Sequence, residues 1–203
     1  MNTLQYLLLA AIGVSLVVTF IMKMPSADRR AARKRLSAAP ELDEASADGA
    51  LVKVTGIVRM REHGERFVSP LSETRCVVLR TRVLVRHGRD PRAKLVEDFK
   101  IMPFMIEDSE GKVLVDAEHA LLDLAPVKES KQAGPRKSQL LSELGHEGAN
   151  SEASAFEETL VEVGTTVTVA GTLAKADPLR IVGTKDQPLA IRLERVSNLE
   201  NEP

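Results

Sequence analysis

The residues of this chain whose types could do chemistry are few and widely spaced. The candidates for a nucleophile, a general base or a metal ligand are the single cysteine, the four histidines and one of the adjacent acidic pairs. They are Cys76, His63, His87, His119, His146 and the pair Glu107 and Asp108. A cysteine nucleophile needs a base beside it and a third group that orients the base. Only the fold could bring such a set together, because Cys76 and the histidines are far apart in sequence.

The local patterns around these residues favour structural roles. No two histidines have HxH or HxxxH spacing and the chain has no CxxC motif, so no metal site is predicted. Cys76 begins an apolar strand-like run, where a free cysteine is usually a small buried hydrophobe. We therefore predict no catalytic, cofactor-binding or metal-binding residues. The alternative is a membrane-tethered, hydrolase-like enzyme that uses Cys76.

Arg80 and Arg82 lie on one face of the run at residues 76–86. Such a pair could bind an anion, but basic residues two apart on a strand more often form a solvated sheet face, which is what we expect here. A barrel that binds single-stranded nucleic acid would need aromatic side chains in a basic groove. The chain has no Trp, one Tyr and a formal net charge of -1, so no nucleic-acid partner is predicted.

Alternating apolar residues predict a mainly β domain, either a small barrel or a sandwich. The clearest signal is a hairpin from Phe104 to Asp116, in which Asp108 bonds its own turn and Gly111 supplies a positive φ. Gly56 indicates a bulge or a close backbone approach. Residues 128–155 break the β pattern and predict a loop insertion with a short helix at 138–144. Strands are predicted at residues 51–60, 76–86, 95–102, 104–108, 112–116, 121–127, 157–163, 166–173, 180–182 and 189–196.

The N-terminal stretch predicts a transmembrane helix over residues 1–23. Residues 1–22 carry no charge, and residues 4–22 would span about 30 Å as a helix, the thickness of a bilayer's hydrocarbon core. A cleaved signal peptide would have a basic start and a shorter apolar run. Basic residues follow the span and none precedes it, which predicts an N-out protein of the cell (inner) membrane with a cytoplasmic domain. Ser15 and Thr19 form a small-xxx-small pair compatible with self-association.

Residues 24–48 are expected to be a linker, basic in its first half and acidic in its second. The Ala-rich basic half predicts a short helix that stops before Pro40, and the acidic half is expected to be mobile. Residues 49–197 then form one domain, followed by a frayed tail at 198–203. One cysteine excludes an intrachain disulfide.

The order of these motifs resembles the GIDE family and its BAM (beside-a-membrane) domain. Val54, Gly56 and Val58, then Ser69-Pro70-Leu71 and Cys76-Val77, are similar to the opening of that domain. The run Phe104, Asp108, Gly111, Val113 and Val115 resembles its central hairpin. Glu158 with Gly164, Val167, Val169 and Gly171 resembles a later strand, and Ile181-x-Gly183 its end. The resemblance covers roughly residues 49–197.

The resemblance implies a β-rich domain beside a membrane, but it does not imply ligase chemistry here. The eukaryotic ligase of the family carries a C-terminal RING finger, which needs eight Cys or His ligands for two zinc ions. This sequence has one cysteine and four histidines. We expect a single-pass, non-catalytic interaction or scaffold module, similar to prokaryotic family members without a RING. Its partners would be the lipid bilayer and a protein that the sequence does not identify.

Overall fold

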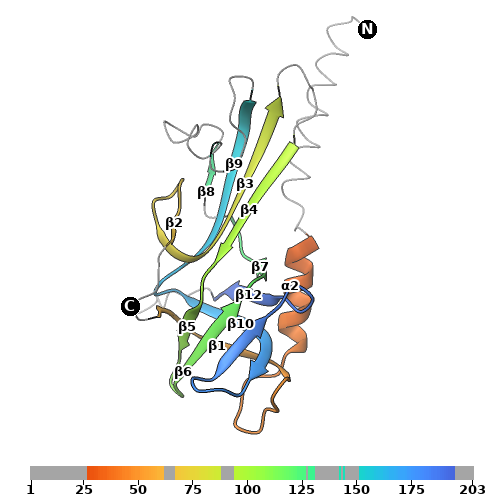
Figure 1. Ribbon diagram of the computed structural model, residues 1–203, viewed down its shortest axis with the longest axis vertical. Coiled ribbons are helices and arrows are strands. Elements are labelled where there is room, and N and C mark those ends of the chain that lie inside the picture. Colours follow the sequence, from red (N-terminus) through yellow and green to blue (C-terminus); the bar gives the residue numbers. More distant parts are fainter. Residues whose placement is uncertain are drawn as a thin grey trace, which may run out of the picture.

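The computed structural model describes residues 27–61, 67–87, 94–126, 128–130, 142, 144 and 151–194 of the 203-residue chain. The predicted transmembrane span at residues 1–23 lies outside the described residues. Within the described part of the chain, no helix is long and apolar enough to cross a membrane. The described helix is α2 (Ala27–Ala38), and the strands fall into a barrel sheet and a second sheet (Figure 1).

The barrel sheet contains seven strands, five of which close on themselves. These five are β1 (Leu51–Met60), β5 (Phe104–Glu107), β6 (Lys112–Ala117), β10 (Thr166–Ala174) and β11 (Arg180–Gly183). Their order around the barrel is β1-β5-β6-β11-β10, and β10 pairs with β1 to close it. All neighbours are antiparallel except β6 and β11. Numbered along the chain, the order is 1-2-3-5-4, which is the topology of an OB-fold barrel.

Two further strands extend the barrel sheet beyond β10. Strand β12 (Leu189–Leu193) pairs antiparallel with β10, and β7 (Ala120–Asp123) pairs parallel with β12. The sequence left a small barrel and a sandwich open, and the closure of β1 onto β10 shows that the fold is a barrel. The predicted strands at 121–127 and 189–196 end earlier, at Asp123 and Leu193.

The second sheet is built from two insertions between barrel strands. The first supplies β2 (Phe67–Val68), β3 (Arg75–His87) and β4 (Lys94–Ile101), and the second supplies β8 (Lys128–Ser130) and β9 (Ser151–Glu162). Strand β3 is central, with β9 on one side and β4 and β2 on the other. The expectation that residues 128–155 lack strands is wrong at both ends, because β8 and the start of β9 fall there. Of the predicted helix at 138–144, only Ser142 and Leu144 are described.

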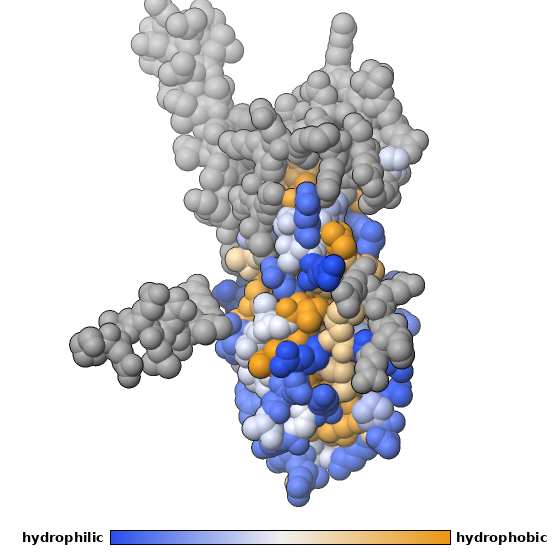
Figure 2. Space-filling model, turned by 90° about the vertical axis from the view of Figure 1, so that its left-hand side faces the viewer, coloured by the Kyte–Doolittle hydropathy of each residue, from blue (hydrophilic) through white to orange (hydrophobic). Residues whose placement is uncertain are grey.

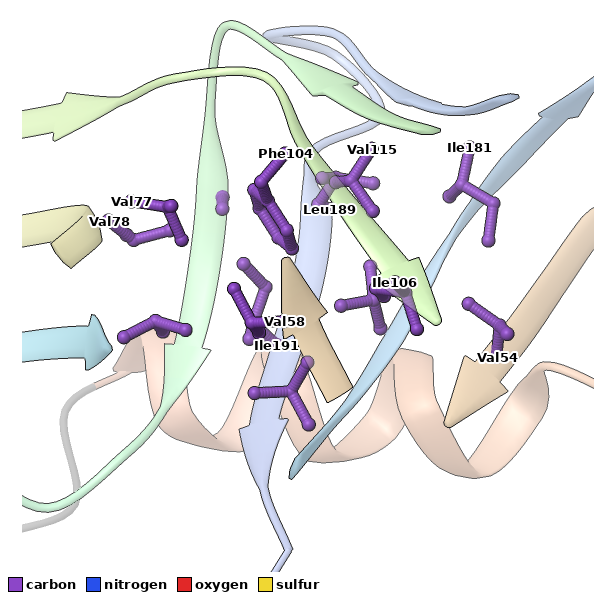
Figure 3. Close-up of a cluster of buried hydrophobic side chains, with 14 of the residues drawn as sticks. Val54, Val58, Val77, Val78, Phe104, Ile106, Val115, Ile181, Leu189 and Ile191 are labelled. Atoms are coloured by element: carbon purple, nitrogen blue, oxygen red, sulfur yellow. The ribbon is translucent and has the colours of Figure 1, made fainter. Parts of the chain in front are cut away.

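The barrel core consists of aliphatic side chains and Phe104, which is fully buried. Figure 3 shows Phe104 between Val77 and Val78 on one side and Val115 and Leu189 on the other. Since Val77 and Val78 belong to β3, the base of the second sheet shares this core. Gly56 meets the prediction of a close approach: a Cβ atom there would lie 2.6 Å from the carbonyl oxygen of Glu107.

The expected linker is joined to the barrel. The predicted basic helix is confirmed as α2, whose Ala32 and Leu36 are buried against Ala170 and Ala190 of the barrel sheet. Small residues on both sides let the helix approach the sheet closely. The acidic half, which was expected to be mobile, also contacts the barrel: Leu42 packs against the barrel core and its N–H donates to the Lys53 carbonyl at 2.8 Å.

The surface of the described residues is mostly polar. Three large hydrophobic side chains of this part of the chain are exposed: Val68, Leu95 and Val163. On the face shown in Figure 2, hydrophobic residues reach the surface of the barrel between hydrophilic ones.

Candidate functional site

Cys76 is held in an environment that suppresses its reactivity. The residue is 1% exposed, and its Sγ lies 4.0 Å from the Phe67 carbonyl oxygen. Burial, followed by the charges of Glu158 and Glu162, raises the pKa of the thiol from 9.0 to about 12. The thiolate is the nucleophilic form of cysteine. At neutral pH almost none of Cys76 is therefore in the thiolate form, which disfavours the enzyme hypothesis based on this residue.

The structure does not bring the histidines to Cys76. The ring of His119 packs edge-on against Phe99, with 5.5 Å between centroids. The backbone of His87 ends β3, whereas Cys76 lies near its start. His63 and His146 lie outside the described residues. Among the residues described, no three His, Cys, Asp or Glu side chains are grouped so that they could hold a metal ion.

The acidic pair Glu107 and Asp108 builds the predicted hairpin. The Asp108 carboxylate accepts the backbone N–H groups of Glu110 and Gly111 at 2.8 and 2.9 Å, and Gly111 has a φ of 153°. Glu107 pairs with Arg59 at 2.6 Å and with Lys112 at 3.2 Å. Hydrogen bonds from Arg59 and then Lys112 lower the pKa of Glu107. Both carboxylates are thereby occupied in the structure of the turn.

A buried carboxylate links the two insertions. Glu158 of β9 is fully buried and accepts the backbone N–H groups of Leu71 and Ser72 at 2.9 and 3.1 Å. It also accepts the hydroxyl of Ser69. Three donors satisfy a charge that would otherwise be costly to bury. The motif Ser69-Pro70-Leu71 and the distant Glu158 are thus two halves of one structural unit.

Arg80 and Arg82 form the largest ionic cluster of the described residues. The Arg80 guanidinium lies 3.3 Å from Asp28 and 3.5 Å from Glu97. Arg82 lies 2.6 Å from Glu97, 3.6 Å from Glu157 and 3.8 Å from Asp28. The expected solvated face is wrong for Arg80, which is 4% exposed and stacks over the Phe99 ring at 5.6 Å. Burial lowers its pKa, and Glu97 opposes that shift.

This cluster and its neighbours attach α2 to both sheets. Asp28 contacts β3, Arg33 pairs with Asp123 of β7 at 2.9 Å, and Arg29 donates to the carbonyl of Leu124. Three carboxylates face the two arginines of the cluster, so the pair is already neutralised within the molecule. An anion at Arg80 and Arg82 would have to compete with these three carboxylates. The sequence pattern of β3 alone could not reveal this contact, because it depends on a residue 52 positions away from Arg80.

A polar groove of about 660 Å³ lies between the C-terminal half of α2 and the barrel. Its charges pair with one another: Lys53 with Glu41 at 3.1 Å, and Arg192 with Glu194 at 2.7 Å. Thr168 donates to Glu194, and this bond, followed by Arg192, lowers the pKa of Glu194. Sequence reasoning missed the groove, although alternating polar residues marked the outer face of β1. Its lining is Arg33, Leu36, Ser37, Glu41, Lys53, Thr55, Thr166, Thr168, Arg192 and Glu194.

Comparison with known proteins decides the family. The family model GIDE, described as E3 ubiquitin ligase, matches residues 79–202, more than half of the chain. The chain belongs to the GIDE family. No curated protein and no solved structure matches it. The GIDE match begins within β3 and runs through β12, so it covers four of the five barrel strands and most of the second sheet, whereas β1 and β2 precede it.

Proposed function

We propose that this GIDE-family protein is a single-pass membrane-anchored, non-catalytic interaction or scaffold module whose domain faces the cytoplasm. The observation that carries the anchor is the uncharged N-terminal stretch of residues 1–22, followed by Lys23 and then, from Ala27, by the basic helix α2. An apolar run of that length suits a bilayer span, and the basic flank suits the cytoplasmic side.

The non-catalytic part of the proposal is supported by the chemistry of the described residues. Cys76 has a strongly raised pKa, and the carboxylates of the hairpin, the Glu158 turn and the arginine cluster are all engaged in structural bonds. The family description names a ubiquitin ligase. One cysteine and four histidines are too few for the eight zinc ligands of a RING. A scaffold that presents a binding surface needs none of these reactive groups.

Protease protection of the full chain, with a C-terminal tag, tests the anchor and its orientation. The protein should sediment with membranes after an alkaline wash, and protease added to intact spheroplasts should spare the tag. A variant without residues 1–23 should appear in the wash. Digestion of the tag from outside would overturn the orientation, and release of the full chain by the wash would overturn the anchor. Crosslinking in intact membranes, followed by mass spectrometry, would then identify the protein partner.

A further inference from the structure

We propose that the outer face of the parallel strands β6 and β11 binds the same face of a second copy of this chain. This inference rests on the interaction module proposed above, and it adds both the surface and the partner. It follows from two charged side chains of this face, Asp116 and Arg180, which have no ionic partner within the described part of one chain.

The proposed surface is a block of four side chains on two neighbouring strands. Successive side chains of a strand point to opposite faces, and Val115 and Ile181 point into the barrel core (Figure 3). The outward-facing block therefore consists of Leu114 and Asp116 on β6 and of Arg180 and Val182 on β11. The register sets Arg180 beside Leu114 and Val182 beside Asp116. One diagonal of the block is thus apolar, and the other carries a cation and an anion.

The block lacks an acceptor for its cation. Arg180 is half-buried, and its Nε atom is buried without a hydrogen-bond partner among the described residues. Leu114 is 3% exposed, and Val182 and Asp116 are half-buried. A buried donor without an acceptor is unfavourable, and a carboxylate brought against it would form a charge-assisted hydrogen bond.

The nearest carboxylates of the same chain do not supply this acceptor. Asp116 lies one strand and two residues away from Arg180, so their Cα atoms are roughly 8 Å apart, and the two side chains do not pair. Glu107, on the outer face of β5, already binds Arg59 and Lys112. The charged diagonal therefore keeps one unpaired cation and one unpaired anion in the described part of the chain.

A two-fold axis pairs both charges at once. In an isologous interface, a residue that contacts a second residue of the partner is matched by the reverse contact. With the axis close to the diagonal from Leu114 to Val182, Arg180 of each copy meets Asp116 of the other. Leu114 and Val182 then meet their own counterparts across the axis. The same face is therefore complementary to itself in both charge and polarity.

The surroundings of the block allow this approach. The residues beside it on β5 and β10 carry no charge: Met105 beside Leu114, Ala174 beside Arg180 and Thr172 beside Val182. A second copy can thus cover the block without burying a further charge, which would be costly.

Disulfide crosslinking of purified full-length protein in detergent tests the contact. Val182→Cys places a thiol beside the proposed axis, where it faces the same position of the second copy. The native Cys76 does not interfere, because it is 1% exposed. The matched control is Glu44→Cys, an exposed position in the loop after α2. Under mild oxidation, the chain with Val182→Cys should form severalfold more covalent dimer than the control.

Charge reversals in the Val182→Cys chain test the pairing itself. Arg180→Glu sets acid against acid, and Asp116→Lys sets cation against cation, so either change alone should reduce the dimer severalfold. Mixing these two variants restores opposite charges at both contacts. The mixed dimer, identified by tags of different size, should therefore return close to the parent level. Arg180→Lys keeps the charge and should retain most of the dimer.

Two results would overturn the inference: single reversals that crosslink as well as the parent, or a mixture that stays monomeric. Oxidation of the Val182→Cys chain in cell extract should give the same dimer, and a disulfide to a protein of another mass in its place would exclude the second copy as the occupant. None of these results bears on the membrane anchor, because detergent-solubilised protein needs no bilayer and the alkaline wash measures the anchor separately.

Discussion

At the scale of single residues, the structure assigns structural roles to the groups that looked most reactive. Cys76 is buried in the second sheet near the barrel, and Glu158 is fully buried with three donors around it. Arg80 is buried under α2 and paired with Asp28. In each case the fold supplies the partner that keeps the group inert.

The first prediction concerns the reactivity of Cys76. A pKa raised from 9.0 to about 12 reduces the thiolate fraction at pH 8 by roughly a thousandfold. Alkylation by iodoacetamide should therefore be slower in the folded protein than in denaturant by at least that factor, as measured by mass spectrometry. Because the folded pKa lies above the unfolded value, the contribution of Cys76 to stability should be constant below pH 9 and be lost as the pH rises toward 12. A Cys76→Ala variant should lose less stability over that range, and equal alkylation rates in the two states would contradict the assignment.

The second prediction concerns the Glu158 carboxylate. In Glu158→Gln, one acceptor oxygen becomes an amide donor that faces the N–H of Leu71 or of Ser72. The buried mismatch should lower the free energy of unfolding by about 1–3 kcal/mol. The matched control is Glu157→Gln, at the neighbouring position, whose side chain is 24% exposed and lies 3.6 Å from Arg82. That change should cost under about 1 kcal/mol. Both free energies would be measured by unfolding in denaturant. Equal values for the two variants would argue against Glu158 as the buried acceptor of this turn.

At the scale of elements, the local sequence determines the hairpin, whereas the position of α2 depends on packing. Turn residues Asp108 and Gly111 bond within four positions of each other, so their pattern was readable. Helix α2 was predicted as a helix, but the contacts that hold it come from β3, β7, β10 and β12. One variant in the hairpin and one in α2 test the two elements separately.

The third prediction tests the hairpin. Gly111 has a φ of 153°, which a β-branched residue strongly resists, although space around its Cα is open. Gly111→Val should lower the free energy of unfolding by about 1 kcal/mol or more. Glu110→Val, one residue earlier in the same turn, changes the side chain without needing a positive φ and should cost much less. Identical unfolding midpoints for the two variants would count against the turn.

The fourth prediction tests the docking of α2. Leu36 is 3% exposed, so Leu36→Ala should destabilise the docked helix by about 2–5 kcal/mol. Amide hydrogen exchange along residues 27–38 should accelerate accordingly. The exposed neighbour Ser37→Ala is the control and should leave exchange nearly unchanged. Fast exchange throughout α2 in the wild-type protein would show that the helix is not held by the barrel.

At the scale of the whole molecule, the barrel and the second sheet act as one body because they share the core around Phe104. The base of β3 contributes Val77 and Val78 to that core, and α2 crosses from one sheet to the other. The barrel, the second sheet and α2 therefore form one rigid unit.

The fifth prediction concerns zinc and ubiquitin. The chain carries too few cysteines and histidines for a RING, so the purified full-length protein should contain much less than one equivalent of zinc by elemental analysis. It should retain its fold in chelator and should not transfer ubiquitin in an assay where a RING ligase does. Cys76→Ser should alter stability modestly and leave partner capture intact. Stoichiometric zinc, or lost capture with the fold preserved, would overturn the non-catalytic proposal.

The sequence by itself determined the features that depend on neighbouring residues. Strand periodicity predicted β1, β3 and β10, the Asp108 and Gly111 pair predicted the hairpin, and Gly56 indicated close packing. The order of the motifs indicated the GIDE family, which the family match confirmed. Each of these signals is local or depends only on order along the chain.

Only the tertiary structure decided how distant segments meet. Closure of the barrel joins β1 to β10, which lies more than a hundred residues later in the chain. The alternation of apolar residues along a strand is the same in a barrel and in a sandwich, so it could not predict this closure. Burial of Arg80, the Glu158 turn and the groove beside α2 likewise depend on partners from other elements. A solvated arginine and a buried one have the same sequence pattern on a strand. The difference lies in what covers that face, and here the covering element is α2.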